Sequence, residues 1–584
     1  MIDLEDIKVE QLLEDPRKDS DTGIARAFFL TSTYGEGEPT DNTVDFVAQL
    51  KQISKADEEK EEIENVSKLD LAELEYGVFG LGNREYEHFN AIGKLFDCAL
   101  ERVGAIRVVE LGLGDDCQDL EGDFETWKDT KFWPTLKKRY ILDTTALDRL
   151  KHAPHKEELP SCCYAVEYHN QSEKPTHIQL EKVHGQSRHY FTAVDCPVQS
   201  MRQLRSKEDP GSTVHIEIDI SKAADFQYVT ADNLGVLPCN QSTVVESVAQ
   251  SLKFDLDLVF SVKPSDGHEW HGAPFPMPIS VRDCLTRYCD LTMAPRRSDL
   301  KLLAAYAKDP TDKKALMRMS SKEGKAEYRE KILDQHFGLV DVLKMCPSVE
   351  ASLEHFLSFC PLLQSRFYTI SSSSSVHPDS IHLTVAVTEA KRKDGTVFKG
   401  VCSDYLASRK PGDLVRIFSR SSTFRLPTDD SKPILMVGPG TGIAPFRGLL
   451  QERLYQKTKK NKSVGTNILY FGCKRRGLDF LYKDELDAFQ KGGILNHLYL
   501  AFSREQSEKV YVQNLLAKNA GETWKLINDQ GGHIYVCGGV KMGNDVMETL
   551  KRIVSERGNM SLEKAKDYLA TVSHEGRYVQ ELWA

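Results

Sequence analysis

Short apolar runs alternate with longer amphipathic stretches in two parts of the chain. Near the start the apolar runs are residues 27–30, 76–79 and 107–111, and near the end they are residues 434–437 and 533–536. Such short runs are typical of buried strands, and strands that alternate with helices predict a parallel sheet. Each part is therefore predicted to form an α/β sheet whose loops emerge together at one edge.

The middle of the chain has a different pattern. Residues 213–220 alternate apolar and polar side chains, and a β pattern returns at residues 366–370. A helical stretch interrupts these strands from about residue 240 to 355. The serine run at 371–375 follows a strand directly, which argues against a flexible linker. Residues 140–185 are polar and contain several prolines, which predicts a hinge.

Composition narrows the class of protein. A chain of 584 residues has room for about three to four domains, and 40% hydrophobic residues suffice for separate cores. No window approaches the roughly 20 apolar residues of a membrane span, and no signal-peptide pattern opens the chain. The formal charge of −11 argues against general nucleic-acid binding and favours a partner with a basic docking face.

The cysteines and histidines predict neither a disulfide framework nor a metal site. The 13 cysteines form no C-x-x-C pair, and the adjacent Cys162 and Cys163 cannot form an ordinary disulfide with each other. Reduced thiols of a cytosolic protein are therefore predicted. Residues 268–271, His-Glu-Trp-His, are one residue short of the zinc-protease motif and are predicted to form a loop.

The most informative motif is the glycine-rich loop at residues 438–446, which follows the apolar run 434–437. Glycines at the mouth of a strand let backbone N–H groups approach phosphate oxygens, and the following helix offers its positive N-terminus. The spacing is neither G-x-G-x-x-G nor a P-loop, because Ile443 stands at the last glycine position and no Lys-Ser/Thr follows. The loop predicts a nucleotide pyrophosphate site, with a plain strand-to-helix turn as the alternative.

A polar cluster follows the apolar run that ends at residue 502. It consists of Ser503, Arg504, Lys509, Tyr511 and Gln513. Arginine offers a planar fork to phosphate and can stack on a base, and lysine adds a point charge. NADPH is therefore expected rather than NADH, with a solvated charged face as the alternative, favoured for Lys509 taken alone. Cys537 directly follows the apolar run 533–536, so it is expected at the same carboxyl edge of the sheet. There it either faces the nicotinamide or is a buried structural thiol.

Two loops near the N-terminus, residues 31–42 and 80–90, each carry a tyrosine, Tyr34 and Tyr86. Rings on adjacent loops can enclose a flat isoalloxazine, and stacking contributes about 0.5–1.5 kcal/mol per ring beyond the buried area. A half-buried packing role is the alternative for each tyrosine. Residues 400–403 begin a turn and a helix and are a second candidate anion site, here for the pyrophosphate of a flavin.

In this order, the motifs resemble those of the diflavin reductases of the NADPH–cytochrome P450 reductase type. The likeness covers nearly the whole chain, and its matching stretches are residues 34–42, 80–90, 366–374, 400–403, 424–427, 437–446, 501–506 and 535–538. It implies a multidomain α/β fold in four parts. These are a partial flavodoxin-like FMN domain at 1–139, a hinge at 140–185, an FAD-binding antiparallel β-barrel at 186–428 with the helical insertion at about 240–355, and a ferredoxin-reductase-type NADP-binding domain at 429–584.

The resemblance also implies which residues meet each cofactor. FMN would be held by Ser32, Thr33, Tyr34, Gly35, Gly82, Asn83, Tyr86, Phe89, Asn90 and Asp116. FAD would be held by Arg366, Tyr368, Thr369, Thr384, Val385, Ala386, Gly400, Val401, Cys402, Ser403 and Trp583. NADP(H) would be held by Arg202, Gly440, Thr441, Ser503, Arg504, Lys509, Tyr511, Gln513 and Asp545. Hydride transfer would involve Thr369, Cys537, Glu581 and Trp583, the last covering the flavin ring.

The chain departs from the family pattern at two of these positions and at its start. Thr369 replaces the usual Ser and Glu581 the usual Asp. A tenfold rate loss corresponds to about 1.4 kcal/mol, which a small misplacement at either position would cause. The first flavodoxin strand, its phosphate loop and the membrane anchor have no counterpart, so an incomplete gene model or a truncated form is expected. FMN would then be held only by its ring.

The resemblance implies electron transfer from NADPH through FAD and FMN to cytochrome P450 or another haem protein. The expected location is cytosolic for this chain, and the cytosolic face of the endoplasmic reticulum membrane for a full-length member. An acidic loop is expected to steer the haem protein, and it contains Asp115, Asp116, Asp119, Glu121 and Asp123. A solvated loop without a docking role is the alternative. The other functions left open are a sister diflavin reductase for sulfite reductase or methionine synthase, an FAD-only NADPH diaphorase, and a non-catalytic interaction form.

Overall fold

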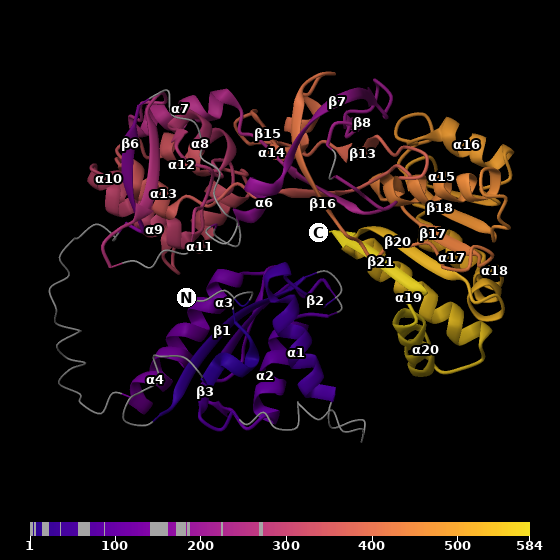
Figure 1. Cartoon of the computed structure of the whole chain (residues 1–584), viewed down its shortest axis with the longest axis horizontal. Coiled ribbons are helices and arrows are strands. Elements are labelled where there is room, and N and C mark those ends of the chain that lie inside the picture. The colour runs from indigo at the N-terminus through magenta and orange to yellow at the C-terminus, as the bar shows by residue number, and fades with distance from the viewer. Residues whose placement is uncertain are drawn as a thin grey trace. The chain divides into compact units, whose positions relative to one another are not determined.

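The computed structural model describes residues 7–13, 23–34, 37–55, 71–86, 88–140, 162–170, 187–223, 226–267 and 272–583, together with Leu4 and Val183. The chain divides into two compact units, residues 1–158 and 159–584, which Figure 1 colours from indigo to yellow. Within these described ranges, no helix combines the length and the apolar character needed to cross a membrane. The loop predicted at 268–271 and most of the predicted hinge lie outside the described residues.

The first unit contains the expected parallel sheet. Its strands are β1 (Ala25–Tyr34), β3 (Leu74–Gly82), β4 (Ile106–Arg107) and β5 (Gly112–Asp115), with the short antiparallel β2 (Glu38–Pro39) at the edge. The strand predicted at residues 107–111 is wrong in extent. This part of the chain pairs with β3 at Tyr76 and again from Phe79 onward, and the segment between the two pairings leaves the ladder.

Helices cover both faces of this sheet. On one face, α1 (Val44–Lys55) and α2 (Ala91–Arg102) enclose a core that includes Phe29 of β1. On the other face, α3 (Leu120–Trp127), a π-helical turn and α4 (Trp133–Tyr140) follow one another around Phe79 of β3. A parallel sheet buried on both sides needs continuously apolar strands, which is the pattern the sequence shows.

The second unit begins with a strand inside the expected hinge. β6 (Tyr164–His169) pairs with β10 (Val259–Pro264), which also pairs with β11 (Ile279–Ser280). The predicted helical stretch packs on this small antiparallel sheet in one core. Its helices are α7 (Ser242–Leu252), α8 (Val281–Arg287), α9 (Arg297–Tyr306), α10 (Pro310–Ser320), α11 (Lys325–Tyr328), α12 (Leu339–Met345) and α13 (Leu353–Phe359).

A six-stranded antiparallel sheet follows, in the order β12-β9-β16-β7-β8-β13. Its strands are β7 (Val194–Gln203), β8 (Thr213–Asp219), β9 (Asn233–Leu237), β12 (Arg366–Thr369), β13 (Ser380–Ala386) and β16 (Leu414–Arg420). The hairpin β14 (Glu389–Lys391) and β15 (Val397–Lys399), then α14 (Val401–Ala407), connect β13 to β16. The antiparallel layer of the predicted barrel is present, and among the described residues no pairing of β12 with β13 closes it.

The chain ends in a five-stranded parallel sheet in the order β19-β18-β17-β20-β21. The strands are β17 (Ile434–Val437), β18 (Asn467–Cys473), β19 (His497–Phe502), β20 (His533–Gly539) and β21 (Tyr578–Trp583). Figure 1 shows α15 (Ala444–Thr458) and α16 (Lys483–Lys491) on one side, and α19 (Val540–Arg557) and α20 (Leu562–His574) on the other. The strand order reverses at β17, so the loops after β17 and β20 meet at the carboxyl edge, where open α/β sheets bind ligands.

A buried carboxylate on β3 ties α4 to the sheet of the first unit. Glu75 on β3 is 2% exposed and accepts hydrogen bonds from Arg26 at 3.2 Å, from Arg139 at 2.9 Å and from the hydroxyl of Tyr140. Burial alone would raise the pKa of Glu75, but the hydrogen bonds from Tyr140 and Arg139 outweigh it and hold that pKa below its usual value of 4.5. Its stabilising effect is therefore present above pH 4.5 and is lost as the pH falls through the lowered pKa.

Removal of this carboxylate is expected to destabilise the first unit. The Glu75→Gln variant removes the charge that pairs with Arg26 and Arg139, whose side chains are part-exposed, at a cost of about 1.5–3 kcal/mol, the range for hydrogen bonds to a charged group. Hydrogen-exchange mass spectrometry of the full chain measures this loss as faster exchange in β1 and β3. Glu101→Gln, which removes an exposed partner of Arg107, is the control, and unchanged exchange in Glu75→Gln would contradict the anchoring role.

Candidate active site

The carboxylate of Glu581 on β21 is shared by two sheets. It accepts hydrogen bonds from Thr369 Oγ1 of β12 at 3.0 Å, from Ser422 Oγ at 2.6 Å and from Asn233 Nδ2 of β9 at 3.1 Å. Thr369 and Glu581, the two positions expected to depart from the pattern of the resembled family, are in direct contact.

Cys537 lies beside this carboxylate. It is the register partner of Glu581 in the pairing of β20 with β21, and it is 1% exposed. Burial and the nearby charge of Glu581 raise the pKa of the Cys537 thiol well above its usual value. The thiol therefore stays protonated at neutral pH. Trp583, opposite Gly539 in the same pairing, is 43% exposed at the end of the strand. Three of the predicted hydride-transfer residues therefore lie on β20 and β21, and Thr369 reaches Glu581 from the antiparallel sheet.

Asn233 and Ser422 are residues that the sequence analysis missed. Ser422 precedes the matching stretch 424–427, and its hydroxyl also accepts a hydrogen bond from the backbone N–H of Phe424 at 3.0 Å. Asp232, next to Asn233, accepts from the side chain of Arg425 and from the backbone N–H of Ser422. Proximity to a matched motif was the available signal for Ser422, and no pattern distinguished Asn233.

Some of the predicted FAD residues have side chains that can reach a ligand, and the others have side chains that pack or bond within the protein. Arg366 is 3.6 Å from Asp290, and Tyr368 on the same strand has its hydroxyl beside the thiol of Cys402, which is 2% exposed. Val385 is fully buried in the core of the six-stranded sheet, and the Thr384 hydroxyl lies 2.7 Å from that of Tyr482. Arg366 and Tyr368 thus retain side chains suited to a ligand, whereas Thr384, Val385 and Cys402 can offer only backbone atoms. Ala386, at the end of β13, is exposed.

The turn at Gly400 leads directly into α14, as the sequence predicts. A Cβ at Gly400 would lie 2.9 Å from Ser403 Oγ and 3.0 Å from Thr388 Cβ, so a larger residue would displace these side chains. Ser403 Oγ is itself used, because it accepts from the backbone N–H of Thr388 at 3.1 Å and donates to the Gly400 carbonyl at 3.2 Å. Val401 lines a cavity of about 790 Å³ between α14 and the helical layer, so there is space beside this turn for a large ligand.

The glycine-rich loop after β17 fits a backbone-lined phosphate site. Gly440 has φ of +57° and a Cβ there would meet open space, while a Cβ on Gly442 would lie 2.1 Å from the carbonyl oxygen of Cys537. Thr441 lies between them in a short 3-10 turn. The close approach of this loop to the end of β20 is possible only without side chains, and it joins the phosphate loop to the hydride-transfer residues.

The predicted dinucleotide residues lie at the same edge of the sheet. Arg504 and Lys509 are exposed, Tyr511 is 44% exposed, and Ser503 follows the last residue of β19. Gln513 on α17 (Val512–Lys518) donates to Asp545 of α19 at 3.1 Å. Arg202, on β7 of the antiparallel sheet, pairs with Glu485 of α16 at 2.7 Å. An amide, a ring, cations and a hydroxyl are therefore available from α17, the preceding loop and β7.

In the first unit, the predicted FMN loops meet at the carboxyl ends of β1, β3 and β5. Ser32 is in register with Leu81, and Gly82 with Asp115, so the two loops and Asp116 leave adjacent strands. Tyr34 is 51% exposed, and Tyr86 is half-buried, which also fits the alternative packing role. Gly35 lies outside the described residues.

Other residues of these loops hold the loops themselves. Asn90 is fully buried with φ of +55° and donates to the carbonyl oxygen of Gly114 at 3.0 Å, and Thr33 accepts from the backbone N–H of Ile92 at 3.1 Å. Asn83 accepts from the backbone N–H of Glu85, and Phe89 lies under the guanidinium of Arg84 at 4.9 Å. These contacts fix the loop shape that presents the two tyrosines.

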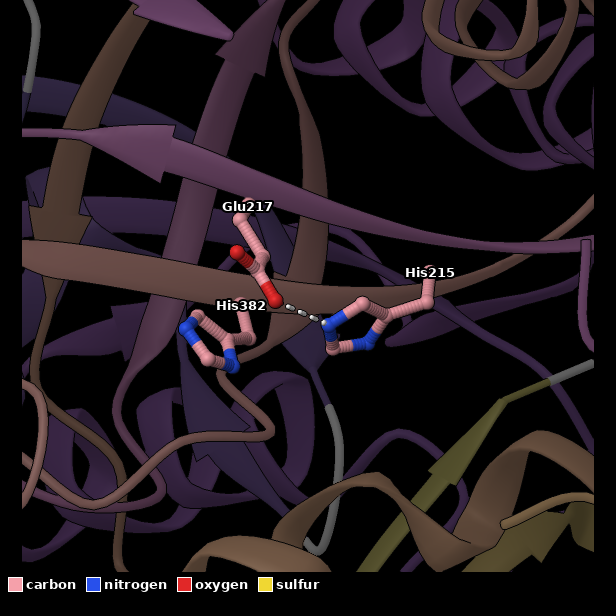
Figure 2. A group of neighbouring side chains, drawn as sticks. All are labelled: His215, Glu217 and His382. Atoms are coloured by element: carbon pink, nitrogen blue, oxygen red, sulfur yellow. Dashed lines mark hydrogen bonds and ion pairs between the residues drawn. The ribbon is translucent and has the colours of Figure 1, made fainter. Parts of the chain in front are cut away.

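His215, Glu217 and His382 form a compact group on β8 and β13, shown in Figure 2. All four ring nitrogens have partners, since His215 contacts Tyr482 at 2.9 Å and Glu217 at 3.1 Å, and His382 contacts Arg447 and Ser380, both at 3.2 Å. Burial and then the charges of Arg447 and Arg202 lower the pKa of His215 to about 3. The group is therefore a hydrogen-bonded network of neutral imidazoles. The positive guanidinium of Arg447 beside His382 Nδ1 disfavours a metal ion there.

Three family models match successive parts of the chain. A flavodoxin model matches residues 3–127, an FAD binding domain model residues 185–405, and an oxidoreductase NAD-binding domain model residues 436–548. The chain is 38% identical over 569 residues to the NADPH–cytochrome P450 reductases of Oryctolagus cuniculus and Homo sapiens, covering 96% of this chain and 81% of each relative. For the Drosophila melanogaster enzyme it is 38% over 589 residues, covering 100% and 83%.

The chain belongs to the NADPH–cytochrome P450 reductase family. As a member of this family, it is an NADPH-dependent oxidoreductase that moves electrons from NADPH through FAD and FMN. The predicted fold class and the three predicted cofactors are confirmed. In this reductase, Glu581 stands on β21 of the parallel sheet and accepts hydrogen bonds from β12 and β9 of the antiparallel sheet. This contact brings the predicted dinucleotide site next to the predicted flavin site.

In this reductase, Cys537 is expected to resist alkylation in the folded state. A thiol that is buried and protonated reacts slowly, because the thiolate is the nucleophile. Iodoacetamide followed by peptide mass spectrometry should modify the exposed Cys98 and Cys163 first and leave Cys537 unmodified until the chain unfolds. Labelling of Cys537 at the rate of Cys98 in the native protein would contradict its burial beside Glu581.

Proposed function

We propose that this reductase delivers electrons from NADPH to a haem protein, with cytochrome P450, named in its relatives, as the acceptor. The observation that carries the proposal is the contact of Glu581 with Thr369 at 3.0 Å, beside Cys537 and Trp583. This group joins the dinucleotide sheet to the flavin sheet, which is the requirement for hydride transfer between two bound rings. Such an enzyme belongs with its acceptors at the cytosolic face of the endoplasmic reticulum membrane.

When bound, the cofactors supply the redox chemistry, because the flavins accept a hydride from NADPH and pass on single electrons. On the FAD side, Arg366 provides a guanidinium for the pyrophosphate and Tyr368 a ring for the flavin. The turn at residues 400–403 and the strand residues 384–386 provide backbone groups. Their side chains are not available, because they are buried or hydrogen-bonded within the protein at Thr384, Val385, Cys402 and Ser403.

On the NADP(H) side, the glycine-rich loop and the nearby cations receive the phosphates. Gly440 and Thr441 offer backbone N–H groups, and Arg504 and Lys509 offer charge that is free to reorient, because both side chains are exposed. Arg202 adds a guanidinium from the opposite sheet. The three-fold hydrogen bonding of Glu581 orients its carboxylate, the protonated thiol of Cys537 can donate a hydrogen bond, and Trp583 covers the ring face.

On the FMN side, Tyr34 and Tyr86 would enclose the ring, and the acidic loop after β5 would receive the haem protein. Only part of that loop is available for docking. Asp119 caps α3 by accepting from the backbone N–H of Gly122 at 3.2 Å, and Asp123 accepts from the backbone N–H of Asp115 at 2.9 Å. We propose Asp116, which is exposed, and Glu121 in the first turn of α3 as the steering charges.

Replacement of Glu581 is expected to slow hydride transfer. Glu581→Gln removes the charge beside Cys537, and Thr369→Val removes one of the hydrogen bonds that orient the carboxylate, so each should reduce the rate about 10- to 100-fold. The measurement is anaerobic stopped-flow reduction of the bound flavin by NADPH. The two changes should be non-additive, because the residues are in contact.

The control for this experiment is Glu575→Gln, which removes an exposed carboxylate near the same strand. Flavin content per chain is measured for every variant, so that loss of FAD is separated from a slower step. A Glu581→Gln enzyme that retains FAD and reduces it at the parent rate would contradict the proposed role of Glu581.

Reversal of a steering charge is expected to weaken use of a basic haem acceptor. Glu121→Lys should lower kcat/KM for cytochrome c about two- to tenfold at low ionic strength, since rim charges act mainly on the association rate. Added salt should remove the difference. Reduction of ferricyanide should stay at the parent rate, and Glu101→Lys on α2 serves as the control. An equal loss with both acceptors would contradict a docking role.

A further inference from the structure

One carboxylate, that of Glu485 in the first turn of α16, is shared by two arginines from different elements. Its Oε1 is 2.7 Å from Nη2 of Arg202 on β7, and its Oε2 is 2.7 Å from Nε of Arg447 on α15. The two arginines differ in their freedom. The side chain of Arg202 is 50% exposed, whereas that of Arg447 is 7% exposed.

Arg447 is fixed by further contacts. Its Nη1 donates to the carbonyl oxygen of Ser371 at 2.8 Å and lies 3.2 Å from Nδ1 of His382, whose neutral ring can accept. Among the described residues, Arg202 has no other ion pair than the one with Glu485. Arg202 can therefore leave the shared carboxylate while Arg447 stays and prevents a half-buried, unpaired charge.

The ring of Tyr482 forms the platform for this exchange. Arg202 and Arg447 lie over it at 5.5 Å and 5.0 Å from its centroid. Its hydroxyl contacts His215 Nδ1 at 2.9 Å and Thr384 Oγ1 at 2.7 Å, so the ring is held in place by β8 and β13. A guanidinium on a fixed aromatic surface can change its ionic partner by a small rotation without losing its packing.

We propose that Glu485 competes with a phosphate of NADP(H) for Arg202, and so limits how tightly the enzyme holds the oxidised product. The inference rests on the proposed role of Arg202 in dinucleotide binding and extends it with a positioning residue that the family models and the site residues above do not include. Two oxygens of a phosphate can accept from a guanidinium as the two oxygens of a carboxylate do, so both ligands use the same N–H groups of Arg202. Binding then breaks one ion pair for each pair that it makes.

The sign of the effect distinguishes competition from simple positioning. If Glu485 competes, its neutralisation frees Arg202 and removes a negative charge near the phosphate, so affinity rises. If Glu485 only orients Arg202, its neutralisation leaves the guanidinium mobile and affinity falls. A merely structural role through Arg447 would also lower affinity, because the strand end at Ser371 would lose its support.

The experiment measures the dissociation constants of NADP⁺ and of adenosine 2′,5′-bisphosphate by calorimetry on the flavin-loaded full chain. Glu485→Gln should bind NADP⁺ about three- to tenfold more tightly at low ionic strength, the range expected for removal of one half-exposed ion pair. With NADPH as substrate, KM should fall while kcat does not rise, because product release slows. Glu485→Asp, which keeps the charge on a shorter arm, should show a smaller change in the same direction.

Asp484→Asn is the matched control, because it removes an exposed charge from the neighbouring position of the same helix turn. It should change the dissociation constant less than twofold. Arg202→Met tests the underlying proposal separately and should weaken NADP⁺ binding. If Arg202→Met has no effect, the dinucleotide role of Arg202 is wrong, and the inference fails with it. If Arg202→Met weakens binding but Glu485→Gln weakens it as well or leaves it unchanged, the competition alone is overturned.

Discussion

The second unit depends on a half-buried carboxylate that accepts hydrogen bonds from two sheets at once. Glu581 stands on the last strand of the parallel sheet, and its hydrogen-bond donors Thr369, Asn233 and Ser422 come from the antiparallel sheet and its loop. A carboxylate left without these donors would carry a large desolvation penalty, so the two sheets are held in one relative position. Two of the proposed hydride-transfer residues, Thr369 and Glu581, are thus also residues that join the two sheets.

A second polar junction joins the same sheets further along the edge. There the neutral rings of His215 and His382 connect β8 and β13 with Tyr482 and Arg447 of the parallel sheet's helical layer. Burial, with the charge of Arg447 next, keeps the pKa of each histidine low, so the junction tolerates arginines without adding positive charge. The enzyme therefore holds a dinucleotide site and a flavin site in fixed register by hydrogen bonds rather than by apolar contact alone.

The first unit uses its polar loop residues differently. Hydrogen bonds to backbone groups near the carboxyl ends of the strands come from Asn90, Asp119 and Asp123. Glu75 on β3 accepts a hydrogen bond from Arg139 and so holds α4 to the sheet. Loops have few neighbours to satisfy their backbone groups, so short polar side chains within the loop take this role. Several acidic residues of this loop therefore support the structure of the loop itself.

The sequence by itself determined the local elements and the phosphate loops. Apolar runs predicted β1, β3, β17 and β20, because a strand buried on both faces has consecutive apolar side chains. Glycines marked the loop at residues 438–446, because a close approach of two backbone segments excludes a Cβ. It did not predict β6, whose polar neighbours resemble a hinge, nor the division between β4 and β5. Only the tertiary structure decided the partners of charged groups, such as Asn233 with Glu581, which are 348 positions apart, or Arg202 with Glu485. Periodicity records which face of an element is buried, whereas a hydrogen-bond partner depends on which distant element packs against that face.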